Sequence, residues 1–190
     1  MEIHLERGSN LRKVISSVFI IFVLFLIGCS NDIDFVEEEP FVKLELYSAS
    51  EGTYLDHYPR IITVANDGSV HVFTEEIVSE YGVVEMKVED DAPTINKEIS
   101  AEKVKEIQQV IEDNRFFSIP EDVTDHRVMD GEGSKITVYD KEQKKTVGGA
   151  NSSNEKYNAI KDIIFDQVRD EYYGWKEETE DYLYKLNEDS

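Results

Sequence analysis

RIITVANDGSVHVF, residues 60–73, carries the clearest folding signal in the chain. Two short runs rich in Val and Ile, residues 60–65 and 69–73, flank the tripeptide Asn66-Asp67-Gly68. Asn, Asp and Gly tolerate the positive φ angles of a tight turn, and β-branched residues favour strands. The stretch therefore predicts a β-hairpin.

Further strands are predicted on both sides of this hairpin. Residues 41–47 (FVKLELY) alternate apolar and polar side chains, which is typical of a half-buried strand. Residues 81–88 (YGVVEMKV) predict another strand and complete an N-terminal meander. Residues 134–139 (SKITVY) and 144–147 (KKTV) predict a second hairpin, which Gly148-Gly149 ends.

Two helices are predicted. Ser100 can cap a helix over residues 101–114, in which apolar residues recur at three- and four-residue spacing. The run Ser152-Ser153-Asn154-Glu155 matches a capping box, and the apolar spacing after it predicts a second helix that continues to Tyr173. Gly174 is a natural stop for that helix.

These elements predict an α+β fold with antiparallel strands in hairpins packed against two helices. Residues 41–175 are enough for a single domain with one core. The alternative is two smaller subdomains divided near Pro93. Residues 176–190 form an acidic C-terminal tail, either a short docking helix or a frayed end.

The first 28 residues have the organisation of an export signal. Arg7, Arg12 and Lys13 precede the apolar residues 14–27, a run shorter than the roughly 20 residues that span a bilayer. An uncleaved signal anchor is the alternative interpretation.

Leu26-Ile27-Gly28-Cys29 resembles the lipobox of bacterial lipoproteins. The resemblance implies that residues 1–28 are a signal peptide cut off after Gly28, and that a diacylglyceryl group joins the Cys29 thiol. Two acyl chains hold a protein stably on a membrane. We therefore expect a lipid anchor at the extracytoplasmic face of the cell membrane.

A second resemblance concerns the folded part. Residues 99–122, which end in paired Phe and a Pro loop, together with residues 133–138 resemble a module that recurs in uncharacterised bacterial lipoproteins. This similarity implies a related fold and no particular activity.

Residues 29–40 are predicted to be the lipidated Cys29 followed by an acidic stalk, because like charges extend a chain. A calcium site made by Asp32, Asp34 and the run Glu37-Glu38-Glu39 is the alternative, although the segment lacks the spacing of a calcium loop.

Composition excludes several classes of protein. With 41 acidic and 20 basic residues the net charge is -21, which disfavours nucleic-acid binding and anionic lipid surfaces and favours a monomer. The chain has one Cys, so it cannot be a disulfide scaffold. If Cys29 is lipidated, the domain has no thiol for catalysis or metal binding, and no cofactor is expected.

Catalytic motifs for serine hydrolases, zinc proteases and nucleotide-binding enzymes do not occur in the sequence. The strongest alternative is a carboxylate and histidine site in the acidic loop, which could bind a metal ion or act as a general base. Its members would be Asp122, Asp125, His126 and Asp130. A solvated loop explains the same residues.

Aromatic residues gather at 172–175. Tyr172, Tyr173 and Trp175 could form a binding surface for a carbohydrate or a peptide, since their rings combine apolar area with a hydrogen-bonding group. They could equally cover the helix end and pack the tail.

The leading hypothesis is a lipid-anchored, extracytoplasmic binding or accessory module of the cell envelope without enzymatic activity. The rivals are a hydrolase or metal-dependent enzyme that uses His126 and its neighbouring carboxylates, and an inhibitor or chaperone of an exported enzyme that presents a strand edge. The sequence identifies no ligand, substrate, partner, reaction or physiological role. It also leaves open which membrane holds the protein in a cell with two.

Overall fold

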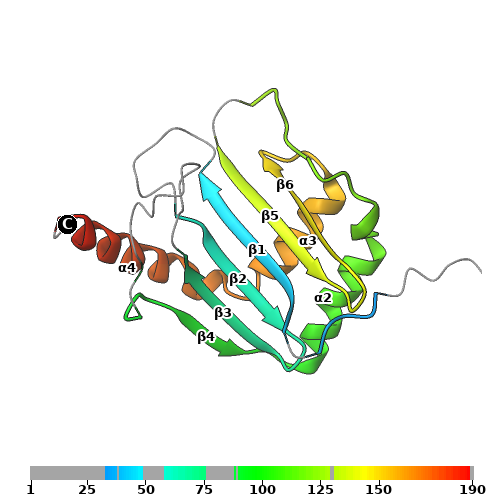
Figure 1. Ribbon diagram of the computed structural model, residues 1–190, viewed down its shortest axis with the longest axis horizontal. Coiled ribbons are helices and arrows are strands. Elements are labelled where there is room, and N and C mark those ends of the chain that lie inside the picture. The colour runs from blue at the N-terminus through cyan, green and yellow to red at the C-terminus, as the bar shows by residue number, and fades with distance from the viewer. Residues whose placement is uncertain are drawn as a thin grey trace, which may run out of the picture. The chain divides into compact units, whose positions relative to one another are not determined.

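A six-stranded antiparallel sheet with helices on one face forms the domain (Figure 1). The computed structural model describes residues 33–37, 39–48, 58–75, 88, 90–128 and 131–188. The strand order is β4-β3-β2-β1-β5-β6. The strands are β1 (Pro40–Ser48), β2 (Arg60–Ala65), β3 (Ser69–Thr74), β4 (Ile95–Glu98), β5 (Glu132–Tyr139) and β6 (Lys144–Ala150). The helices are α2 (Ala101–Asp113), α3 (Glu155–Phe165) and α4 (Arg169–Glu188), with a 3-10 turn, η2 (Phe116–Ser118), after α2. The predicted single α+β domain is confirmed.

The hairpin predicted from residues 60–73 is present as β2 and β3. Gly68 adopts φ +92°, and its backbone N–H donates to Ala65 O over 3.1 Å. The Asp67 carboxylate accepts the N–H of Ser69 at 2.8 Å. Positive φ favours glycine, which explains why the turn forms at this position.

Strand β1 lies inside the sheet and pairs with both β2 and β5. Its residues Val42 and Leu44 are fully buried and face the helices. The intervening Lys43 belongs to a polar row on the opposite face, which crosses all six strands. In register, the row is Thr146, Thr137, Lys43, Thr63, His71 and Asn96. The alternation seen in the sequence thus separates an apolar face from a polar one.

Helix α2 begins where the sequence predicts. The Ser100 hydroxyl accepts the N–H of Lys103, and Val104, Ile107 and Ile111 are buried against the sheet. Phe116 follows in the 3-10 turn and is fully buried. Spacing and cap chemistry together therefore located this helix.

The second predicted helix is two helices in the structure, so the domain has three helices where two were expected. Helix α3 is capped by Asn154, whose side chain accepts the N–H of Tyr157, and not by Ser152. It ends at Phe165, and three residues separate it from the start of α4 at Arg169. The prediction that Gly174 stops the helix is wrong, because α4 passes through it.

Helix α4 continues to Glu188 because apolar burial continues beyond Gly174. Trp175 is 4% exposed and Leu183 is 2% exposed, eight residues further on. This burial outweighs the cost of about 1 kcal/mol for an internal glycine. Most of the predicted acidic tail, residues 176–188, is therefore a docked helix.

Two strands differ from the prediction. Strand β4, which pairs with β3, was not expected from the sequence. Strand β6 includes Gly148 and Gly149, which the sequence assigned to its end. A Cβ atom at Gly149 would lie 2.4 Å from the backbone N of Thr124, so glycine here permits a close approach of the neighbouring segment. Of the predicted strand at residues 81–88, all but residue 88 lies outside the described residues.

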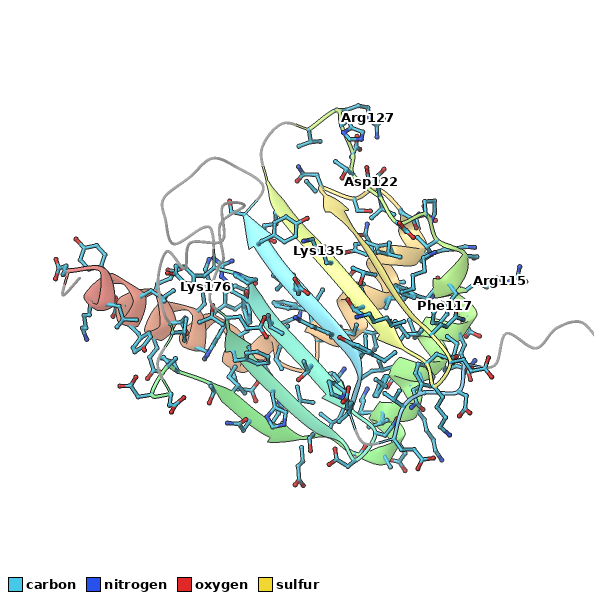
Figure 2. The ribbon with its side chains drawn as sticks, viewed as in Figure 1. Arg115, Phe117, Asp122, Arg127, Lys135 and Lys176 are labelled. Atoms are coloured by element: carbon cyan, nitrogen blue, oxygen red, sulfur yellow. The ribbon has the colours of Figure 1, made fainter. Side chains whose placement is uncertain are left out.

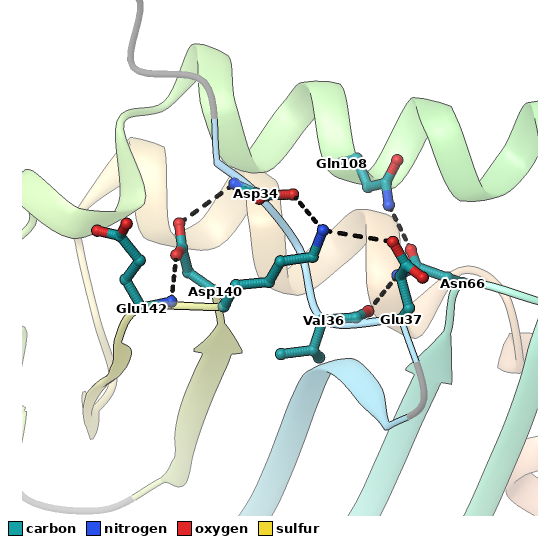
Figure 3. Close-up of polar contacts among 8 residues, drawn as sticks. Asp34, Val36, Glu37, Asn66, Gln108, Asp140 and Glu142 are labelled. Carbon is teal, nitrogen blue, oxygen red and sulfur yellow. Dashed lines mark hydrogen bonds and ion pairs between the residues drawn. The ribbon is translucent and has the colours of Figure 1, made fainter.

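Residues 33–37 form a strap that packs on the domain (Figure 3), although the sequence assigned them to an extended stalk. Phe35 is 9% exposed and meets Phe41 edge-on at 5.1 Å between ring centroids. Asp34 N–H donates to the Asp140 carboxylate at 3.2 Å, and Lys141 forms ion pairs with Asp34 at 3.0 Å and Glu37 at 3.3 Å. The stalk prediction is therefore wrong for these residues, because the charges are paired and a large ring is buried.

Polar contacts also tie the strap to the turn between β2 and β3. The Asn66 side chain donates to the carbonyl oxygen of Val36, and Gln108 on α2 donates to Asn66 at 2.6 Å (Figure 3). One end of the sheet, formed by the β2–β3 and β5–β6 turns, thus holds the strap.

Within the described residues, no helix has both the length and the apolarity required to cross a bilayer.

Candidate functional site

The acidic loop that the sequence singled out lies between η2 and β5, as Figure 2 shows for Asp122 and Arg127. His126 Nε2 is 3.9 Å from the Asp122 carboxylate, and both side chains are mostly exposed. Asp125 instead pairs with Arg127 at 2.6 Å. The structure therefore places Asp122 and His126 close together and pairs Asp125 with Arg127. Asp130 lies outside the described residues.

Hydrogen bonds set the electrostatics of this loop. The Arg127 side chain and backbone donate to Asp125 and lower its pKa to about 2. Hydrogen bonds from Thr124 likewise lower the pKa of Asp122. No group of three or more potential metal ligands occurs among the residues that the structure describes. Both pKa values are lowered further from neutral pH, which makes these carboxylates weak general bases.

The same loop has a structural role at the edge of the sheet. Val123 N–H donates to Gly148 O at 3.0 Å, and Asp125 N–H donates to Ala150 O at 2.9 Å. The loop therefore satisfies backbone groups of the outermost strand β6, which would otherwise be open to pairing with another chain.

The predicted aromatic surface is mostly interior. Tyr172 is 5% exposed, and Trp175 donates its indole N–H to Pro93 O at 2.9 Å. Tyr173 is 60% exposed and meets Tyr172 edge-on at 5.7 Å between ring centroids. Of the three residues, Tyr172 and Trp175 pack the helix against the sheet, while Tyr173 offers a ring to solvent.

Tyr173 stands on the wall of an open groove of about 230 Å³. Helix α3 contributes Lys161 and Phe165, four residues apart, and the acidic Asp162 to this wall. Helix α4 contributes Arg169 and Lys176, seven residues apart, with Tyr173 between them. These spacings place the side chains on one face of each helix. Figure 2 shows Lys176 on α4 beside the sheet.

The ends of two neighbouring strands form the opposite wall. Leu46 comes from the end of β1, and Glu132 and Ser134 come from the start of β5. The Ser134 hydroxyl lies 2.8 Å from the buried hydroxyl of Tyr157, and burial raises the pKa of Tyr157 to about 12. This neutral, hydrogen-bonded pair fixes the position of the groove wall relative to α3.

Charged and aromatic side chains share the helical wall. Arg169 donates to Asp166 at 2.8 Å, and its guanidinium lies 5.1 Å from the centroid of the Phe165 ring. Lys176 is 3.6 Å from the Glu180 carboxylate. The groove can therefore offer hydrogen bonds, charge and ring faces to a small ligand, which are the features of a binding site.

Sequence reasoning identified only the aromatic part of this groove. Arg169, Tyr173 and Lys176 recur at helical spacing, so a shared face of α4 could have been inferred. Nothing in the sequence associates that face with Leu46 or Glu132, because both contacts depend on the sheet order.

Two predicted site residues, Cys29 and Asp130, lie outside the described residues. No protein-family model matches the chain, and no curated protein matches it significantly.

Proposed function

We propose that this chain is a bacterial lipoprotein, anchored through Cys29 to the extracytoplasmic face of the cell membrane, which acts as a non-enzymatic binding or accessory module. The observation that carries the binding role is the groove between the α3–α4 wall and the ends of β1 and β5. This groove brings charged side chains and an exposed aromatic ring together in one place.

The anchoring part of the proposal rests on the sequence. A basic leader and an apolar run precede Leu26-Ile27-Gly28-Cys29, and Cys29 is the one cysteine of the chain. Each buried CH₂ of an acyl chain contributes about 0.8 kcal/mol, so two chains suffice to retain the domain at a membrane.

The strap limits how far the domain could lie from such an anchor. Three residues separate Cys29 from Ile33, the first described residue, and this tether spans at most about 14 Å when extended. The strap end of the sheet would therefore stay close to the bilayer. Leu46, on the groove wall, lies six residues along β1 from Pro40, or about 20 Å further along the strand. The groove would thus lie at the end of β1 that is remote from the strap.

Cys29→Ser tests the proposal in cells that express the full chain, with Ser30→Ala as the matched control. Wild type and Ser30→Ala should sediment with membranes and carry an acylated Cys29 at a new N-terminus, as measured by mass spectrometry. Cys29→Ser should lack the acyl mass and should not be cut before residue 29. The same processed and membrane-retained product from Cys29→Ser would overturn the anchoring role.

A further inference from the structure

One cation of the groove has no ion-pair partner among the described residues, although the carboxylate of Asp162 also lines the groove. Arg169 pairs with Asp166, and Lys176 pairs with Glu180. Lys161, half-buried on α3, has no ion-pair partner among the residues that the structure describes. In a chain with 41 acidic and 20 basic residues, an ammonium group in a concavity without a carboxylate partner is available to a ligand.

The strand wall carries the opposite charge. Glu132 is exposed at the start of β5, and its carbonyl oxygen is occupied by Asn151 N–H at 3.1 Å. Within the described part of the chain its carboxylate has no ion-pair partner either. A ligand in the groove would therefore lie between an ammonium group on the helical wall and a carboxylate on the strand wall.

A ring face completes the site. Tyr173 is 60% exposed, and its contact with the buried Tyr172 supports it from one side. Aromatic side chains offer a large contact area at low conformational cost, and they pair with other rings edge-on or offset.

We infer that the groove binds a small zwitterion with an aromatic ring, that is, a free aromatic amino acid or a dipeptide containing one. Its carboxylate would pair with Lys161, its ammonium group with Glu132, and its ring would pack against Tyr173. The inference deepens the proposed binding role and rests on it.

Charge and size favour this class over others. A net charge of -21 repels polyanions such as nucleotides at long range, whereas a zwitterion has no net charge. The groove of about 230 Å³ is smaller than the roughly 300 Å³ at which pockets for drug-sized ligands begin. One amino acid or a dipeptide fits better than an extended chain.

Titration calorimetry on the detergent-solubilised full chain tests the inference with four probes. L-phenylalanine has all three groups, its amide lacks the carboxylate, N-acetyl-L-phenylalanine lacks the ammonium group, and glycine lacks the ring. L-phenylalanine should bind saturably, and each of the other three should bind about tenfold more weakly or worse, because each loses a charged or aromatic contact. A dipeptide series, Phe-Gly and Gly-Phe, distinguishes a free amino acid from a dipeptide.

Three variants assign the contacts. Lys161→Gln should weaken L-phenylalanine about tenfold and leave its amide unaffected, and Glu132→Gln should weaken L-phenylalanine but not the N-acetyl compound. Tyr173→Ala should weaken all ligands that carry a ring. Lys105→Gln, an exposed lysine on α2 outside the groove, is the control and should bind as wild type does.

Equal affinity for L-phenylalanine and its amide, no saturable binding up to about 10 mM, or unchanged binding by both Lys161→Gln and Glu132→Gln would overturn the inference. Mass spectrometry of the same preparation reports acylation of Cys29. A preparation that is acylated but does not bind refutes the ligand class alone, whereas one that binds but is not acylated refutes only the anchor.

Discussion

The hydroxyl groups of Ser134 on β5 and Tyr157 on α3 lie 2.8 Å apart in the interior of the domain. Tyr157 is fully buried, and Ser134, which lines the groove, is 7% exposed. Each hydroxyl satisfies the other where water is excluded, so the pair joins the sheet to the helix at a fixed position.

Tyr157→Phe should lower the free energy of unfolding by about 1 kcal/mol, because the ring still fills its site while Ser134 loses its buried partner. Urea denaturation followed by circular dichroism measures the change. An unchanged midpoint would mean that the hydrogen bond does not contribute to stability.

The domain should lose stability at alkaline pH. Burial raises the pKa of Tyr157 and of Tyr172 to about 12, whereas an unfolded tyrosine has a pKa of about 10. The stabilisation is complete below pH 10 and is lost as the pH rises towards 12, by roughly 2 to 3 kcal/mol for each tyrosine. Denaturation curves at pH 9 and pH 11.5 check this, and Tyr157→Phe should lose less between the two values than wild type.

Phe35→Ala should destabilise the domain by about 3 kcal/mol, because it leaves a cavity beside Phe41 and frees the strap. Tyr184→Ala serves as the control, since Tyr184 is 53% exposed and its loss should change stability by less than about 0.5 kcal/mol. Equal effects of the two substitutions would show that the strap does not pack on the domain.

Replacing either of two glycines by alanine should change the stability of the domain, in opposite directions at the two positions. A Cβ at Gly174 meets no atom within 4 Å, so Gly174→Ala should stabilise α4 by about 0.5 to 1 kcal/mol. A Cβ at Gly149 would lie 2.4 Å from the backbone N of Thr124, so Gly149→Ala should destabilise by about 1 to 3 kcal/mol. Thermal unfolding of both variants provides the comparison, and a destabilised Gly174→Ala would argue against a continuous helix.

Arg127→Gln should raise the pKa of Asp125. The side-chain hydrogen bonds of Arg127 are the largest cause that lowers this pKa to about 2, so their loss should raise it part of the way towards the usual value of about 3.9, while the backbone N–H of residue 127 still donates. A pH titration of the Asp125 carboxylate by NMR measures the shift. The Asp122 pKa, which hydrogen bonds from Thr124 lower, should stay unchanged in this variant.

The elements that the sequence predicted correctly are those with local causes. The turn at Asn66-Asp67-Gly68 needs a positive φ that Gly68 supplies, and α2 starts at the Ser100 cap. Both effects act between residues at most four apart, so they can be recognised from residues that are close together in the sequence.

The prediction that the helix ends at Gly174 is wrong for a different reason. The apolar spacing runs without interruption from Ile160 through Val168 to Tyr172, so the sequence merges α3 with the start of α4. Glycine is a stop only where the chain has nothing to bury beyond it, and here Trp175 and Leu183 pack against the domain. Tertiary burial thus overrode the local preference.

The hairpins, the start of α2, the α+β class and the acidic character of the chain can be read from the amino-acid order alone, because they follow from composition and from contacts between near neighbours. The strap and the groove arise only when the chain is folded. Asp34 meets Asp140 across 106 positions, and Leu46 and Lys176 line the same groove. Such contacts exist only after the order of the strands is fixed, and that order is set by burial of the whole sheet rather than by any single segment.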